Sequence, residues 1–74
     1  MSIEDFISNV ADQFDDPVEL TPETRFRELE GWSSLVALLI ITMVDDEYGI
    51  VLPPEEMRKT MTIQELYDLV ASKC

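Results

Sequence analysis

The sequence predicts an all-α fold, a small bundle of three main helices plus one short helix. Apolar residues recur at helical intervals in three separate segments. No segment alternates apolar and polar residues in the manner of a half-buried strand. The chain has 74 residues, enough for one modest core, so we expect a single domain spanning residues 1–74.

The first helix is expected from Ser2 to about Phe14. Ser2 can cap its N-terminus, and Asp5 completes a weak capping box. Pro17 follows two acidic residues and ends the segment. The helix has one apolar face, made of Ile3, Phe6, Ile7, Val10, Ala11 and Phe14.

A long loop is expected from Pro17 to Trp32. Within it, Thr21-Pro22-Glu23 resembles a cap followed by a proline at the first helical position, so we expect a single turn there. Phe26 and Leu29 are the apolar residues that would anchor the loop to the core. A loop of this length in a small domain is usually functional.

The second helix is expected from Ser33–Ser34 to Tyr48, with Gly49 as its C-terminal stop. It is apolar on nearly every side, and a domain this small can hardly bury one helix completely. Part of its surface is therefore a candidate docking site. One apolar set comprises Leu35, Leu38, Ile41, Val44 and Tyr48, and the other comprises Val36, Leu39, Ile40 and Met43.

Two further helices are expected in the last third of the chain. Pro53-Pro54-Glu55-Glu56 can open a short helix that ends near Lys59. Thr62 then caps the last helix, Glu65 completes a capping box, and Met61 can pack on Leu66. The inward residues of the last helix are Ile63, Leu66, Tyr67 and Val70.

The composition restricts the possible partners. The net charge is −11, from 16 acidic and 5 basic residues. Such a surface repels nucleic acid and anionic membranes, so neither is an expected partner, whereas basic protein surfaces are attracted. There is no apolar run that could span a membrane, and the charged N-terminus does not resemble a signal peptide.

Metal and thiol chemistry are also restricted. The chain has no histidine and one cysteine, so sites built on His and Cys clusters are excluded. Asp45, Asp46 and Glu47 do not have the spacing of a calcium loop, and a solvated helix end is the default interpretation. Cys74 is expected to be an inert terminal thiol, and a single cysteine fits a reducing, cytoplasmic compartment.

The most informative segment is Glu30-Gly31-Trp32-Ser33-Ser34-Leu35. A glycine leads into a pair of serines that opens a strongly apolar helix. N-capping by Ser33 explains one serine completely. It explains neither the second serine nor the long loop before it.

Here the chain resembles the acyl and peptidyl carrier protein family. Ser34-Leu35 matches the family's modified serine and the leucine that follows it at the start of the second helix. Three other segments match in the same order, and the resemblance covers essentially the whole chain. These segments are Leu20–Leu29, Asp45–Ile50 and Thr62–Leu66.

The resemblance implies a carrier rather than an enzyme, with no catalytic residue in this chain. Ser34 would be joined by a phosphodiester to 4′-phosphopantetheine, which a phosphopantetheinyl transferase takes from coenzyme A. The thiol of that arm would hold acyl or aminoacyl groups for partner enzymes of fatty acid, polyketide or related biosynthesis. A monomer is expected.

Two departures from the family pattern bear on its partners. Ser33 stands where the family usually has an Asp that contacts the modifying enzyme and its metal. Val36 and Leu39 stand where fatty-acid carriers commonly have acidic residues. We therefore expect partners to dock by apolar contact on Val36, Leu39 and Ile40. The acidic docking candidates are Asp45, Asp46 and Glu47, with Glu28 and Glu30 in the loop.

Other functions remain open at this point. The main alternative is an unmodified helical module that docks a partner through the apolar helix and carries nothing. Its best support is the absence of Asp before Ser34. An enzyme would need a cleft that so small a domain can hardly enclose.

Overall fold

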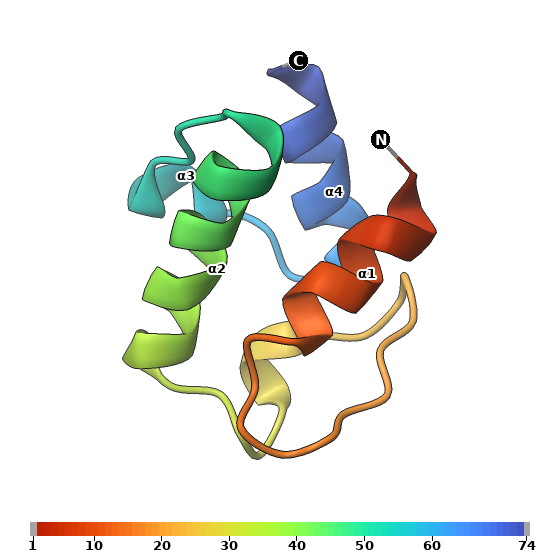
Figure 1. The fold of residues 1–74 in the computed structure, drawn as a ribbon. Coiled ribbons are helices and arrows are strands. Elements are labelled where there is room, and N and C mark those ends of the chain that lie inside the picture. Colours follow the sequence, from red (N-terminus) through yellow and green to blue (C-terminus); the bar gives the residue numbers. More distant parts are fainter. Residues whose placement is uncertain (1, 74) are drawn as a thin grey trace.

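The computed structural model describes residues 2–73, and in that range all regular elements are helical, as predicted (Figure 1). Met1 and Cys74 lie outside the described residues, so the structure does not test the prediction that Cys74 is an inert thiol. The elements are α1 (Ile3–Ala11), the 3₁₀ turn η1 (Phe26–Glu28), α2 (Ser34–Tyr48), α3 (Pro54–Met57) and α4 (Ile63–Ser72).

Helix α1 begins where the sequence predicts and ends earlier. The Ser2 hydroxyl accepts a hydrogen bond from the N–H of Asp5 at 3.2 Å, which confirms the cap. The helix ends at Ala11 instead of Phe14, because the next turn tightens. The N–H of Phe14 bonds to the oxygen of Ala11, three positions back, in the 3₁₀ pattern common at helix ends. Phe14 is nevertheless buried, as its place in the apolar face predicts.

The long loop is bound to the start of α4. The N–H of Ile63 donates to the oxygen of Thr24 at 3.1 Å, and the N–H of Gln64 donates to the oxygen of Pro22 at 2.9 Å. The expected turn is present, since the N–H of Thr24 bonds to the oxygen of Thr21 at 3.0 Å. Phe26 is fully buried and anchors the loop to the core, as predicted. The 3₁₀ turn η1, to which Phe26 belongs, was not predicted.

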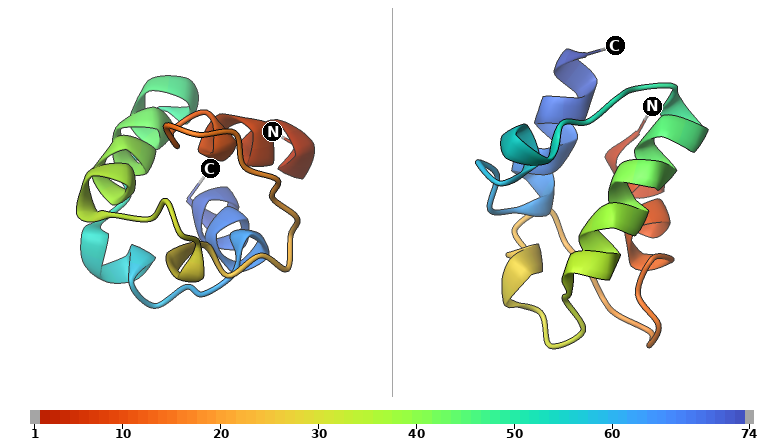
Figure 2. Two further views of the ribbon diagram at one scale, coloured as in Figure 1. Left: turned by 90° about the horizontal axis from the view of Figure 1, so that it is seen from below. Right: turned by 90° about the vertical axis from the view of Figure 1, so that its left-hand side faces the viewer.

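The core lies between α1, α2 and α4, and α3 lies in the connection that leads from α2 to α4 (Figures 1 and 2). Phe6 of α1 joins the three main helices, because its ring centre lies 6.1 Å from that of Tyr48 and 5.6 Å from that of Tyr67. The start of α1 and the end of α4 lie at one end of the bundle, and α2 starts at the other (Figure 1). The core comprises Phe6, Val10, Phe14, Phe26, Val36, Ile40, Met43, Val44, Ile50, Leu52, Met57, Ile63, Leu66 and Val70.

Helix α2 buries part of the face that was expected to be exposed. Val36 is 7% exposed and Ile40 is fully buried, so the prediction that these two residues lie on an exposed docking surface is wrong. Leu35, Leu38 and Leu39 are the exposed ones. Because both faces of α2 are apolar, hydrophobic spacing cannot select the inner one, and packing against α1 and the loop does so.

The ends of the later elements follow the predicted signals. Gly49 ends α2 at φ 67°, a left-handed conformation that glycine adopts without strain. Helix α3 ends at Met57, before the predicted Lys59. At α4 the capping box is complete: the hydroxyl of Thr62 accepts from the N–H of Glu65, and the Glu65 carboxylate accepts from the N–H of Thr62.

Candidate functional site

The two serines at the start of α2 have separate roles. Ser33 is the N-cap, with extended backbone, and its hydroxyl accepts a hydrogen bond from the N–H of Val36 at 3.3 Å. Ser34 is the first helical residue and is exposed. Its hydroxyl makes no hydrogen bond to any residue from 2 to 73. Ser34 and Leu35 also lie in the first turn, where backbone N–H groups have no partner within the helix.

The approach to the serines is held firmly. The Trp32 ring centre lies 5.3 Å from that of Phe26 and 6.4 Å from that of Phe14. The N–H of Trp32 bonds to the oxygen of Leu29 at 3.0 Å. A Cβ on Gly31 would lie 3.3 Å from a ring carbon of Phe14, so a glycine suits this close approach. Ser34 is therefore an exposed hydroxyl on an ordered junction.

A groove of about 340 Å³ begins beside Ser34. One wall is a single face of α2, at positions three, four and seven after Ser34, and the opposite wall comes from α3 and the loop. Sequence reasoning singled out Trp32 and missed the two arginines. The available signal was the small number of basic residues, 5 in the chain. The lining residues are Arg27, Trp32, Ser34, Ala37, Leu38, Ile41, Pro54, Met57 and Arg58.

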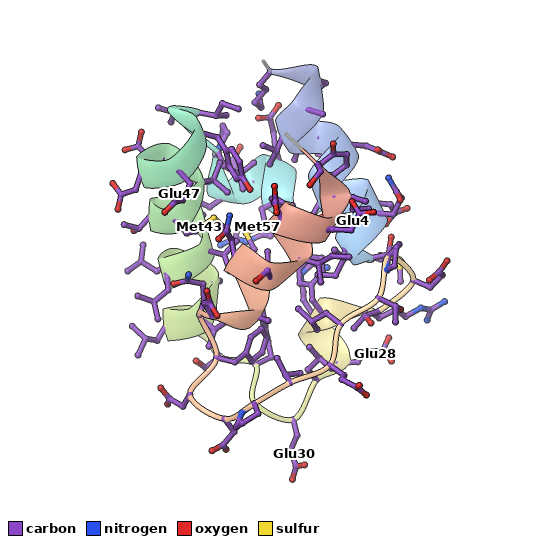
Figure 3. All side chains as sticks on the ribbon, turned by 45° about the vertical axis from the view of Figure 1, so that its right-hand side comes forward. Glu4, Glu28, Glu30, Met43, Glu47 and Met57 are labelled. Atoms are coloured by element: carbon purple, nitrogen blue, oxygen red, sulfur yellow. The ribbon has the colours of Figure 1, made fainter. Side chains whose placement is uncertain are left out.

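The acidic docking candidates are not brought together. Asp45, Asp46 and Glu47 are exposed in the last turn of α2, and the rise of a helix puts them about 17 Å or more from Ser34 along the axis. Glu30 extends from the loop at the opposite end of the molecule from Glu47 (Figure 3). Glu28, the other loop candidate, forms an ion pair with Arg25 at 3.5 Å, so the acidic candidates do not form one docking region.

Within residues 2–73 no three His, Cys, Asp or Glu side chains are grouped so as to hold a metal ion. None of the described helices is long and apolar enough to cross a membrane.

Comparison with known proteins assigns the chain to a family. Residues 4–70 match the family model of the phosphopantetheine attachment site. The chain belongs to the acyl carrier protein family. An acyl carrier protein of Thermosynechococcus vestitus is 35% identical over 65 residues, which cover 86% of this chain and 80% of that protein. An acyl carrier protein of Rubrobacter xylanophilus is 36% identical over 55 residues, which cover 74% of this chain and 68% of that protein.

A relative that is named after a polyketide synthase is similar to the same extent. The polyketide-8 synthase acyl carrier protein 2 of Streptomyces avermitilis is 37% identical over 65 residues, which cover 86% of this chain and 75% of that protein. No solved structure gives a significant match.

As an acyl carrier protein, the chain carries 4′-phosphopantetheine covalently and acts as a carrier rather than an enzyme. The structure fits such a group. At the start of α2 an exposed hydroxyl without a protein partner lies in the helix turn that most favours a phosphate, because the backbone N–H groups there are unpaired and the helix dipole is positive.

Proposed function

We propose that Ser34 is the attachment residue of this acyl carrier protein. The observation that carries the proposal is that the hydroxyls of the two serines differ in their hydrogen bonding. The Ser33 hydroxyl is occupied by the cap of α2, whereas the Ser34 hydroxyl is exposed and unpaired within residues 2–73. The first turn of α2 also stabilises a phosphate at Ser34.

The attachment reaction needs only a reachable hydroxyl from this chain. Ser34 Oγ forms a bond to the phosphorus that bears the pantetheine, the diphosphate bond of coenzyme A breaks, and 3′,5′-ADP leaves. The hydroxyl proton passes to a base of the transferase, because no group near Ser34 in this chain serves as one. When attached, the arm supplies a thiol that holds acyl groups as thioesters.

Intact-mass measurement tests the assignment. Apo protein is incubated with coenzyme A and a broad-specificity phosphopantetheinyl transferase, for wild type and for the Ser34→Ala and Ser33→Ala variants. We expect one pantetheine adduct on wild type and Ser33→Ala, and none on Ser34→Ala. An adduct that persists in Ser34→Ala and disappears in Ser33→Ala would move the site to Ser33. No adduct with several transferases would favour the unmodified interaction module.

Partner enzymes are proposed to dock on the exposed leucines of α2. Leu35 is 62% exposed, Leu38 59% and Leu39 37%, and all three lie within two turns of Ser34. Of the apolar docking residues expected from the sequence, Leu39 alone keeps this role, because Val36 and Ile40 are buried. An apolar patch beside the attachment residue suits contact with a partner that must reach the arm.

The acidic residues Asp45, Asp46 and Glu47 are proposed to steer basic partners toward the far end of the same helix. Charges at the rim of an interface mainly raise association rates and fix orientation. Their distance from Ser34 suits this role, since a partner can contact the acidic end while its active site lies near the arm.

The docking surface is tested with Leu39→Glu. We expect transfer of an acyl group to a partner enzyme to fall at least about fivefold, because a carboxylate must then be buried in the interface. Val51→Glu is the matched control, since Val51 is 76% exposed and lies outside α2. Equal transfer rates in wild type and Leu39→Glu, with unchanged helicity, would exclude Leu39 from the interface.

The setting in which the carrier works is also a proposal. The acyl groups would be intermediates of fatty acid, polyketide or related biosynthesis. A reducing compartment such as the cytoplasm suits the arm, because its thiol must stay free to form thioesters. A net charge of −11 favours a monomer through mutual repulsion.

A further inference from the structure

The groove beside Ser34 differs in charge from the rest of the molecule. The chain has 16 acidic residues, yet none lines this groove. Two of the 5 basic residues, Arg27 and Arg58, line it together. A cleft lined by charges of one sign attracts ligands of the opposite sign, so a groove with two arginines and no carboxylate suits an anionic ligand.

Arg27 is held in place by its neighbours. It is half-buried, and its guanidinium lies over the Phe26 ring at 5.1 Å and donates to the oxygen of Met57 at 2.6 Å. That oxygen belongs to the peptide bond that leads into Arg58, so the backbone brings the two arginines to one place. A guanidinium has five N–H donors, and Arg27 uses a single one in this bond, which leaves others for a carboxylate or phosphate.

The two arginines are also without acidic partners. Among residues 2–73, the ion pairs join Arg25 to Glu28 and Lys73 to Glu56. Neither Arg27 nor Arg58 pairs with a carboxylate in that range. The other walls are apolar or aromatic, including Trp32 and Leu38. The groove thus combines an apolar channel with two free cationic donors, which suits a ligand with a hydrocarbon part and an anionic end.

We propose that this groove binds acyl groups that carry a free carboxylate, with Arg27 and Arg58 as the anion-binding residues. The inference rests on the proposed attachment at Ser34, which places the acyl group within reach of the groove. It names the class of cargo: an acyl thioester with a second acidic group, rather than a simple alkyl chain.

The phosphate of the arm is the other possible anion, and the geometry favours the carboxylate. A phosphate on Ser34 lies at the helix start, where unpaired N–H groups already stabilise it. The groove continues along α2 to Ile41, seven residues or about 10 Å beyond Ser34. A phosphate bonded to the Ser34 oxygen cannot fill that length, whereas an acyl group at the end of the flexible arm can.

The test compares two cargoes of equal carbon number. The arm is attached with a promiscuous transferase from coenzyme A, adipoyl-coenzyme A or hexanoyl-coenzyme A, and intact mass verifies each product. The side-chain Nε–H signals of arginine are then recorded by NMR. We expect the signals of Arg27 and Arg58 to shift on adipoyl loading and to stay unchanged on hexanoyl loading.

A second measurement uses thioester hydrolysis. We expect the adipoyl thioester of Arg58→Gln to hydrolyse at least about tenfold faster than that of wild type, the change expected for one charge-assisted hydrogen bond. The hexanoyl thioester should show no difference. Lys59→Gln is the matched control, because Lys59 is the neighbouring cation and does not line the groove. Arg58 is exposed, so its replacement leaves the fold intact.

Each contrary result has its own meaning. Arginine signals that shift on attachment of the unloaded arm, and no further with adipoyl, would assign the site to the phosphate and overturn the proposal. Equal responses to adipoyl and hexanoyl would also overturn it. A missing adduct in the mass spectrum would instead contradict attachment at Ser34, and the cargo inference would fall with it.

Discussion

Arg27 and Met57 are joined by a hydrogen bond of 2.6 Å from the guanidinium to the main-chain oxygen, which ties η1 to α3. The same oxygen accepts a bond from the Thr60 hydroxyl at 2.7 Å. The long loop is therefore fixed at two points, through Arg27 to α3 and through hydrogen bonds to the start of α4.

Arg27→Ala should lower the free energy of unfolding by about 1–2 kcal/mol, because it removes a hydrogen bond from a charged donor and exposes the Phe26 ring. Urea unfolding at neutral pH measures the change. Arg25→Ala is the control, since Arg25 forms an exposed ion pair with Glu28 at 3.5 Å and should cost less than about 0.5 kcal/mol. Equal effects of the two replacements would show that the bond to Met57 contributes nothing.

Ser33→Ala should lower the free energy of unfolding by about 1 kcal/mol, because the N–H of Val36 loses its side-chain acceptor. Ser33→Asp should be at least as stable as wild type, since a carboxylate keeps the cap and favours the positive end of the helix. Thermal and urea unfolding of the apo proteins measure both. An Asp variant less stable than the Ala variant would contradict a capping role for this position.

Glu65 makes stability depend on pH. Hydrogen bonds from the N–H groups of Met61 and Thr62 hold the pKa of its carboxyl below the ordinary value of 4.5. A pKa lowered by folding adds stability above the unfolded pKa, and this stability is lost as pH falls through the folded pKa. The difference in unfolding free energy between wild type and Glu65→Gln should therefore be larger at about pH 7 than at about pH 3.

Chemical denaturation at both pH values measures that difference. Glu19→Gln is the control, because it removes one carboxylate from an exposed position on the loop. If the stability difference for Glu65→Gln were the same at both values, its carboxylate would not be selectively stabilised by the fold.

Ile40→Ala and Leu38→Ala distinguish the two faces of α2. Ile40 is fully buried, so its truncation should cost about 2–5 kcal/mol. Leu38 is 59% exposed, and its truncation should cost less than about 1 kcal/mol. Urea unfolding of both variants measures the contrast. Similar losses for the two would mean that the inner face of α2 has been assigned wrongly.

The sequence predicts the helix ends well because their signals are local. The caps at Ser2, Ser33 and Thr62 and the stop at Gly49 each depend on residues within one turn, and the structure has all four. The end of α1 was predicted too late, since its apolar spacing continues through a tighter final turn. Helix α3 also ends earlier than predicted, and the N–H of Lys59 bonds three positions back to the oxygen of Glu56. The family could also be predicted from the sequence, because several segments of the chain match segments of the carrier protein family in the same order.

The orientation of α2 and the charge of the groove could not be predicted in this way. Both faces of α2 are apolar, so Val36 and Leu39 are equivalent in the sequence and differ only in what packs on them. Arg27 and Arg58 are 31 positions apart, and their meeting depends on the path of the loop and of α3. Such a pair is visible only in three dimensions.

The bonds from Ile63 and Gln64 to the loop have a consequence for the order of assembly. The loop that presents Ser34 obtains these partners from a segment made about forty residues after Pro22 and Thr24 in synthesis. Contacts so distant in sequence form late, since a long closure must precede them. During synthesis, Ser34 therefore leaves the ribosome before the α4 segment that holds its loop in place has been made. A transferase that recognises the ordered junction would modify only chains in which the α4 segment has been made and has folded against the loop.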